Sequence, residues 1–210
     1  MPKIVDHEKQ RQAVAEAALR VIRRSGLDYA TVRNIAEEAG LSVGSMRHYF
    51  SSQAELFAFC MNLFVKRVEE RIAGMTFNGP VLQDLVKLLL QFMPLDEDRK
   101  TEMEVWLSFN AKGLSYPELK TLSNEMHDGL FQASVFTVKT LMEQGLALPG
   151  LDAELEAEKL YAIMDGLSIH HVLHPGRMTN ERLEEIIRLH LHSLCSKEAL
   201  DSGKGGDPIG

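Results

Sequence analysis

The stretch from Thr31 to Phe50 constrains the fold of this 210-residue chain more than any other part of its sequence. Its first half carries apolar residues at helical spacing, which indicates a short amphipathic helix. Gly40 follows where that helix must end, because glycine enters the left-handed conformation without steric cost. Ser42 then stands where a hydroxyl can cap a second helix. Two short helices joined by a turn that contains glycine are typical of a helix-turn-helix.

The second helix is predicted over residues 43–49 and is too short to bury much surface by itself. Gly44 allows another backbone to approach closely, and the polar residues are Ser45, Arg47, His48 and Tyr49. Such groups suit phosphates and base edges, so we interpret the stretch as a DNA-reading motif. The alternative is an ordinary helical hairpin of a bundle.

A known family shares this pattern. The residues T-V-x-x-I-A-x-x-A-G-L-S-x-G-S-x-x-x-Y-F-x-S-x-x-E-L closely resemble the DNA-binding region of the tetracycline-repressor (TetR) family. The run from Gly44 to Gln53 resembles the branch that includes betaine-responsive repressors. Many members carry an aromatic residue where Arg47 stands and a lysine where Gln53 stands. The expected DNA contacts are Thr31, Val32, Arg33, Ser42, Val43, Gly44, Ser45, Arg47, His48, Tyr49 and Gln53.

The resemblance implies a ligand-responsive transcriptional regulator, most simply a repressor. It implies a homodimer on a palindromic DNA operator and release by a small-molecule inducer, with no cofactor and no membrane partner. In the implied mechanism, ligand in the body shifts a connector helix and changes the separation of the two DNA-reading heads.

Charge is unevenly distributed along the chain. Residues 1–75 hold 11 Lys/Arg against 9 Asp/Glu, whereas residues 76–210 hold 12 against 21. This mildly basic head and acidic body suit a protein that meets phosphates with one end. No apolar run approaches the ~18 residues that cross a bilayer, and the N-terminus lacks the apolar core of a signal peptide. Two cysteines within helical patterns favour a reduced, cytoplasmic location over a disulfide scaffold.

The periodicity predicts an all-α fold of about nine helices and no strand. We expect a DNA-binding head over residues 1–50, with the helix-turn-helix at about 31–50. A connector helix is expected over 52–74, a ligand-binding and dimerisation domain over 78–197, and a disordered tail over 198–210.

The start of the connector has a local signal of its own. Ser52 and Glu55 form an S-x-x-E capping box, which predicts a helix that begins at Gln53. Its length of about twenty residues spans about 30 Å.

The body is rich in aromatic residues and methionine from several helices. Most such residues are core, yet apolar pockets between bundle helices also bind small molecules. Trp106 and Asn110 are four residues apart and share a helix face, and Asp165 offers a charged contact. The candidate ligand-binding residues are Phe92, Met103, Trp106, Phe109, Asn110, Phe131, Met164 and Asp165.

The last two helices, at about 152–174 and 179–196, should pack antiparallel. In the family this pair joins its copy in a second subunit as a four-helix bundle. The apolar content exceeds what an outer helix exposes, although some of these side chains must face the protomer's own core. The candidate interface residues are Ile163, Leu167, His171, Leu183, Ile187, Leu191 and Leu194.

No motif for a phosphate loop, a nucleophile elbow or a zinc protease is present. His170 and His174 share a helix face with metal-ligand spacing, beside His171, and the candidates for a further ligand are His127 and Asp165. Packing or hydrogen bonding is the more common role of such residues. Four alternatives stay open: a helical small-molecule binder with a structural helix-turn-helix, an enzyme built the same way, a transcriptional activator, and a regulator that acts through a protein partner.

Overall fold

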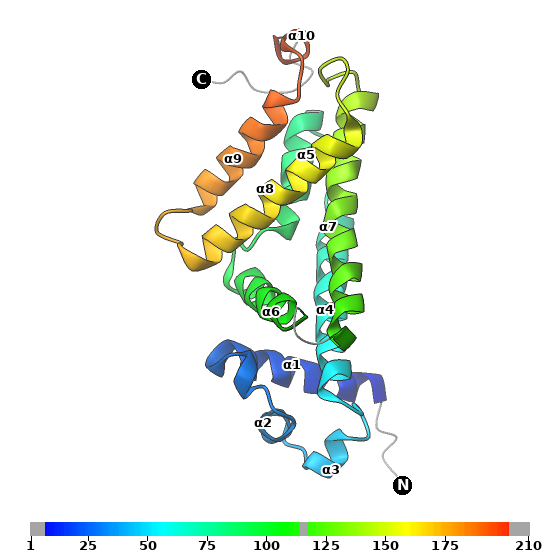
Figure 1. The fold of residues 1–210 in the computed structure, drawn as a ribbon, viewed down its shortest axis with the longest axis vertical. Coiled ribbons are helices and arrows are strands. Elements are labelled where there is room, and N and C mark those ends of the chain that lie inside the picture. Colours follow the sequence, from blue (N-terminus) through cyan, green and yellow to red (C-terminus); the bar gives the residue numbers. More distant parts are fainter. Residues whose placement is uncertain (1–6, 114–116, 202–210) are drawn as a thin grey trace. The chain divides into compact units, whose positions relative to one another are not determined.

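A computed structural model describes residues 7–113 and 117–201, and these ranges are predominantly helical (Figure 1). The only β feature within them is an isolated bridge between Ala147 and Cys195. The helices are α1 (His7–Ser25), η1 (Leu27–Tyr29), α2 (Val32–Glu38), α3 (Val43–Met46), α4 (Gln53–Ala73), α5 (Val81–Leu89), η2 (Leu90–Phe92), α6 (Glu97–Gly113), α7 (Pro117–Glu143), α8 (Ala153–Leu173), α9 (Asn180–Ser193) and α10 (Lys197–Asp201). The predicted all-α class is confirmed.

Helix ends differ from the prediction at α3. The helix ends at Met46 instead of Tyr49, because the backbone hydrogen bonds change there from the i→i−4 to the i→i−3 pattern. The amides of His48 and Tyr49 donate to the carbonyls of Ser45 and Met46. Such tightening commonly closes a helix whose last carbonyls lack partners.

The C-terminal end also differs from the prediction. The sequence predicts a disordered tail from residue 198. In the structure, residues 197–201 form α10, and Ala199 is buried. Ser196 caps this helix, since its hydroxyl accepts a hydrogen bond from the amide of Ala199. The remainder of the predicted tail, 202–210, lies outside the described residues.

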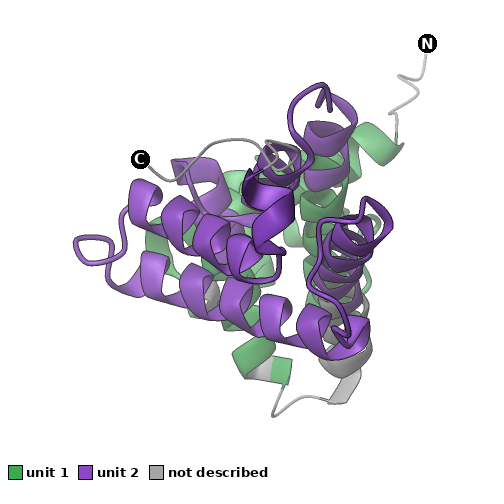
Figure 2. Ribbon diagram, turned by 90° about the horizontal axis from the view of Figure 1, so that it is seen from above, with its two compact units in different colours: residues 1–67, 104–123 green, residues 68–103, 124–210 purple. Residues whose placement is uncertain are grey.

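The chain divides into two compact units (Figure 2). Unit 1 comprises residues 1–67 and 104–123, and unit 2 comprises residues 68–103 and 124–210. Helices α4, α6 and α7 therefore each contribute residues to both units.

In unit 1, one face of α1 supplies the centre of the core. Val14, Ala17, Ala18 and Val21 repeat at i, i+3, i+4 and i+7 and are buried, as the sequence pattern predicts. The small alanines let α2 pack closely against α1. The other buried residues of this core include Ile35, Ala36, Met46, Phe50, Leu56, Phe57, Cys60 and Met61.

In unit 2, α5, α8 and α9 share a hydrophobic core. Helices α8 and α9 run in opposite directions from the turn around Gly176 (Figure 1). The fully buried residues of this core include Leu82, Leu89, Leu160, Met164, Leu183, Ile187 and Leu191.

The two cysteines are free and buried. Burial raises the pKa of Cys60 to about 12 and that of Cys195 to about 11, so both thiols stay protonated at neutral pH. They serve as small apolar packing groups.

Within the described ranges, no helix is both long and apolar enough to span a bilayer.

Candidate nucleic-acid interface

Two hydroxyl caps and one glycine shape the helix-turn-helix. The Thr31 hydroxyl accepts a hydrogen bond from the amide of Asn34 at 3.2 Å, and Ser42 accepts one from Ser45 at 3.0 Å. Gly40 lies between the helices with a φ of +67°, the left-handed conformation predicted for it. The caps satisfy amides that a short helix otherwise leaves open.

Helix α3 is anchored on one side and open on the other. Met46 is 2% exposed and Phe50 is 3% exposed, so both side chains lie in the core of unit 1. Val43, Gly44, Arg47 and His48 are consequently turned outward and are exposed. Since one face is fixed by burial, the other face has a defined orientation toward solvent.

The first residue of α1 lies against the end of this motif. A ring nitrogen of His7 lies 3.3 Å from the carbonyl oxygen of His48, and the rings of His7 and Tyr49 are 5.1 Å apart between centroids. Tyr49 is therefore half-buried, whereas His48 remains exposed.

The cations of α1 and those of the helix-turn-helix differ in their pairing. Arg20 and Arg24 donate to the two carboxylate oxygens of Glu38 at 2.8 and 3.0 Å, and these bonds hold the pKa of Glu38 below its usual value. Arg33 and Arg47 are exposed and form no ion pair within the described part of the chain. Their positive charge is consequently available to a partner molecule.

Gln53 makes a contact that sequence reasoning missed. Its side-chain amide donates to the carbonyl oxygen of Ala30 at 2.7 Å, which ties the start of α4 to the residue before the cap of α2. The side chain is exposed, but this donor is already engaged. No local signal predicts the bond, because the partners are 23 residues apart.

The capping box at the start of α4 forms, but its glutamate bonds to a different residue from the one expected. The Ser52 hydroxyl accepts from the amide of Glu55 at 3.1 Å, as predicted. The Glu55 carboxylate, however, accepts from both the amide and the hydroxyl of Ser51 at 2.8 Å, one residue before the cap. These bonds, with Arg11 at 3.3 Å, lower the pKa of Glu55.

Arg11 is a second residue that the sequence pattern did not single out. Its guanidinium carbon lies 4.6 Å from the ring centroid of Phe50 and 4.8 Å from that of Phe59. With its ion pair to Glu55, it joins α1, the end of the helix-turn-helix and α4. The position of α3 thus depends on a cation–π contact as well as on apolar burial.

The candidate ligand-binding residues fall into both compact units. In unit 2, Met164 belongs to the hydrophobic core, and Phe92 and Phe131 pack against it; Met103 and Asp165 are half-buried. In unit 1, Phe109 is buried while Trp106 and Asn110 are half-buried.

Most candidate interface residues are buried within the protomer. Six of the seven are buried in unit 2, namely Leu167, His171, Leu183, Ile187, Leu191 and Leu194, and only Ile163 is half-buried. These six residues are only 0–6% exposed, so they pack within the protomer and leave almost no surface for a second copy. The surface left on the same helices carries Leu155 and Leu173 of α8 and Leu189 of α9, all exposed.

The histidine group of α8 is divided between core and solvent. His171 is buried, with Nδ1 2.6 Å from the carbonyl oxygen of Met178, while His170 and His174 are exposed. Within the residues that the structure describes, no group of three or more His, Cys, Asp or Glu is arranged for a metal. The side chain of His127 lies outside the described set.

Comparison with known proteins gives two family matches. Residues 14–59 match "Bacterial regulatory proteins, tetR family". Residues 81–196 match "BetI-type transcriptional repressor, C-terminal".

Individual relatives agree with these matches. The chain is 40% identical over 205 residues to the HTH-type transcriptional regulator PksA of Bacillus subtilis, covering 97% of this chain and 98% of that protein. It is 29% identical over 188 residues to the regulator BetI of Stenotrophomonas maltophilia, covering 89% and 93%.

Solved structures show the same architecture. A transcriptional regulator from Rhodococcus sp. Rha1 is 28% identical, with a TM-score of 0.75 over 88% of this chain and 95% of that chain. The fold is also shared by a regulator from Saccharomonospora viridis in complex with choline, at 23% identity and a TM-score of 0.73 over 90% and 100%. The chain therefore belongs to the TetR family of DNA-binding transcriptional regulators and carries a C-terminal domain of the BetI type.

Proposed function

We propose that this regulator is a homodimeric repressor that leaves a palindromic operator when a small-molecule inducer binds its body. The observation that best supports the proposed DNA binding is the exposed face of α3. Arg47 is exposed and free of ion pairs among the described residues, next to Met46, which is buried. An arginine held in this way can donate two hydrogen bonds to a guanine edge or contact a phosphate.

The rest of the proposed DNA surface follows from the same face. Val43, Gly44 and His48 lie beside Arg47, and Arg33 adds a second unpaired cation from α2. Thr31 and Ser42 contribute chiefly as caps, because their oxygens already accept amide hydrogens. Since DNA lies in the bacterial cytoplasm, we expect the protein there.

Mutation of Arg47 tests this surface directly. We expect Arg47→Ala to reduce operator affinity by about 1–3 kcal/mol if the side chain reads a base, or to lower the salt slope by about one if it contacts a phosphate. Its melting temperature should match that of the unmodified protein, because Arg47 is exposed and its side chain forms no hydrogen bond or ion pair within the described chain.

Fluorescence anisotropy with a labelled operator over a range of salt concentrations measures both effects. Arg182→Ala is the matched control, since Arg182 is exposed on α9 in the other compact unit. Unchanged affinity and slope for Arg47→Ala would remove α3 from the interface. Salt-independent DNA binding by the unmodified protein would favour a small-molecule binder with a structural helix-turn-helix.

The proposed inducer site rests on the helical spacing of Trp106 and Asn110, which are four residues apart on α6 and both half-buried. Trp106 is the only tryptophan, so its fluorescence reports on this region. We expect an inducer found by screening for operator release to change the tryptophan emission, and Trp106→Phe to raise the concentration needed for release without weakening operator binding. If a true inducer leaves both properties unchanged, the inducer binds elsewhere.

A further inference from the structure

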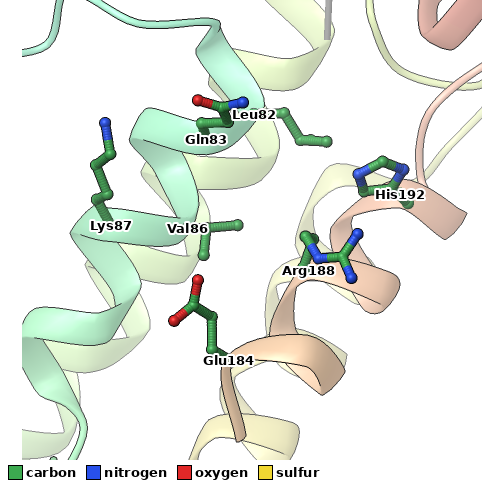
Figure 3. Close-up of a pocket in the computed structure, with 7 residues that line it drawn as sticks. All are labelled: Leu82, Gln83, Val86, Lys87, Glu184, Arg188 and His192. Atoms are coloured by element: carbon green, nitrogen blue, oxygen red, sulfur yellow. The ribbon is translucent and has the colours of Figure 1, made fainter. Parts of the chain in front are cut away.

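Helices α5 and α9 of unit 2 enclose a cleft of about 330 Å³ (Figure 3). This volume lies at the lower end of the range for small-molecule sites, about 300–1,000 Å³. The lining residues are Leu82, Gln83, Val86, Lys87, Glu184, Arg188 and His192. None of them belongs to the proposed DNA surface, to the Trp106 region or to the exposed apolar residues of α8 and α9.

His192 supplies a buried polar group without a partner. The residue is 8% exposed, and its Nδ1 has no hydrogen-bond partner within the described part of the chain. A buried polar atom left in this state destabilises the fold, because it has lost its bonds to water and gained none in return. Native proteins normally satisfy such atoms with protein, water or ligand.

Arg188 lies one turn before His192 on α9 and supplies an unneutralised charge. It forms no ion pair among the described residues, although Glu184 is one turn away on its other side. Arg188 and His192 both line the cleft, where burial and then the Arg188 charge lower the pKa of His192. The imidazole is therefore neutral at pH 7, and one of its nitrogens carries a hydrogen.

The other charges of the cleft are arranged differently. Lys87 is paired with Asp84 at 3.2 Å, and Asp84 also accepts the amide of Gly79 at 2.9 Å. Glu184 points into the lower end of the cleft in Figure 3, away from His192. Leu82 and Val86 of α5 form its apolar wall. The unpaired positive charge therefore lies at the end near His192.

We propose that the α5–α9 cleft is a second ligand site, which binds a small organic carboxylate. The carboxylate pairs with the Arg188 guanidinium, whose fork matches its two oxygens, and accepts a hydrogen bond from the His192 ring. The hydrocarbon part contacts Leu82 and Val86. A simple anion and a zwitterion share this chemistry, and a zwitterion would in addition place its ammonium group at Glu184.

Nuclear magnetic resonance of the full chain with isotope-labelled histidine tests the proposal. The probes are butyrate, the zwitterion 4-aminobutyrate and the neutral amide butyramide, which have nearly the same size. We expect at least one of the two carboxylates to shift the His192 ring signals saturably, with a Kd of about 1 mM or below, and butyramide to leave them unshifted. Loss of one set of signals in His192→Asn identifies the residue.

Substitutions then locate the binding. Arg188→Gln should weaken carboxylate binding at least about tenfold, while Arg182→Gln, the same change at an exposed site outside the cleft, should not. If Arg188→Gln does not fold, Arg188→Met replaces it, because methionine is a flexible side chain that also removes the charge. Tighter binding of 4-aminobutyrate that is lost in Glu184→Gln identifies a zwitterion site; tighter binding of butyrate identifies an anion site.

Three results would overturn the proposal. They are the absence of any saturable shift at His192, equal shifts with butyramide, and carboxylate binding that survives in a folded Arg188 variant. None of these results depends on operator binding, so they leave the proposed repressor function unaffected.

Discussion

At the scale of single residues, the exposed side of α3 has little role in the packing of the chain itself. A Cβ added at Gly44 meets only the Ser42 hydroxyl at 3.8 Å, an ordinary contact distance, and the backbone does not need glycine there. Replacement by alanine should therefore leave the fold intact. Space at this position is useful only to a molecule that approaches from outside.

Gly44→Ala is accordingly expected to separate stability from DNA binding. The melting temperature should stay the same or rise, because alanine favours a helix by about 0.5–1 kcal/mol over glycine. Operator affinity should fall by about 1–3 kcal/mol, the usual cost of overpacking a tight contact. Gly129→Ala is the control, since Gly129 is another exposed helical glycine with open space around it. Equal operator affinity in both variants would show that no backbone approaches Gly44.

At the scale of elements, the start of α4 is held by a charged cap. The Glu55 carboxylate accepts from Ser51 and pairs with Arg11, and its pKa is lowered mainly by the Ser51 amide. A group with a lowered folded pKa contributes stability that is present above its unfolded pKa and lost as the pH falls through the folded value.

Glu55→Gln should therefore destabilise the protein at neutral pH and much less in acid. Because the side chain is 37% exposed, solvent limits the effect to about 1 kcal/mol, or about 2–4 °C in melting temperature. The difference from the unmodified protein should shrink as the pH drops from about 6 to below the usual glutamate value of 4.5. Melting curves over this range measure it, and a difference that does not change with pH would exclude an ionised cap.

The elements also show how far sequence reasoning reaches. Local signals predicted the Gly40 turn, the Ser42 cap and the buried stripe of α1, because neighbours in the chain determine them. Contacts between distant residues were not predictable, among them the bond from Gln53 to Ala30 and the packing of Arg11 on Phe50. These contacts depend on how the helices pack against one another, and the residues next to each partner in the sequence carry no signal for that packing.

At the scale of the whole molecule, α8 and α9 show the same limit of prediction from sequence. Apolar periodicity identified α8 and α9 but did not separate the face that packs inside one chain from the face left outside. Leu191 is 0% exposed, whereas Leu189, two residues earlier on α9, is 45% exposed. We propose that the exposed residues Leu155, Leu173 and Leu189 contribute to the dimer contact.

Substitution of Leu189, compared with substitution of Leu191, tests the proposed dimer. Leu189→Glu should fold and shift the protein from dimer to monomer at micromolar concentration, because a charge within an apolar contact opposes association. Leu191→Glu should instead lower stability severely, because it buries an unpaired charge in the core. Sedimentation velocity and thermal melts distinguish these outcomes. A Leu189→Glu variant that remains dimeric would exclude this face, and a monomeric unmodified protein would exclude the dimer.

In the proposed complex, two copies of the α2–α3 motif read one symmetric DNA site. Selection of binding sequences from a random DNA pool by the purified protein tests it most directly, with Arg47→Ala selected in parallel. We expect enriched sequences with two inverted half-sites, whose centres lie about one helical turn of DNA or a multiple of it apart, and little enrichment by Arg47→Ala. Failure to enrich any sequence, or enrichment of a single unpaired half-site that Arg47→Ala selects equally well, would contradict it.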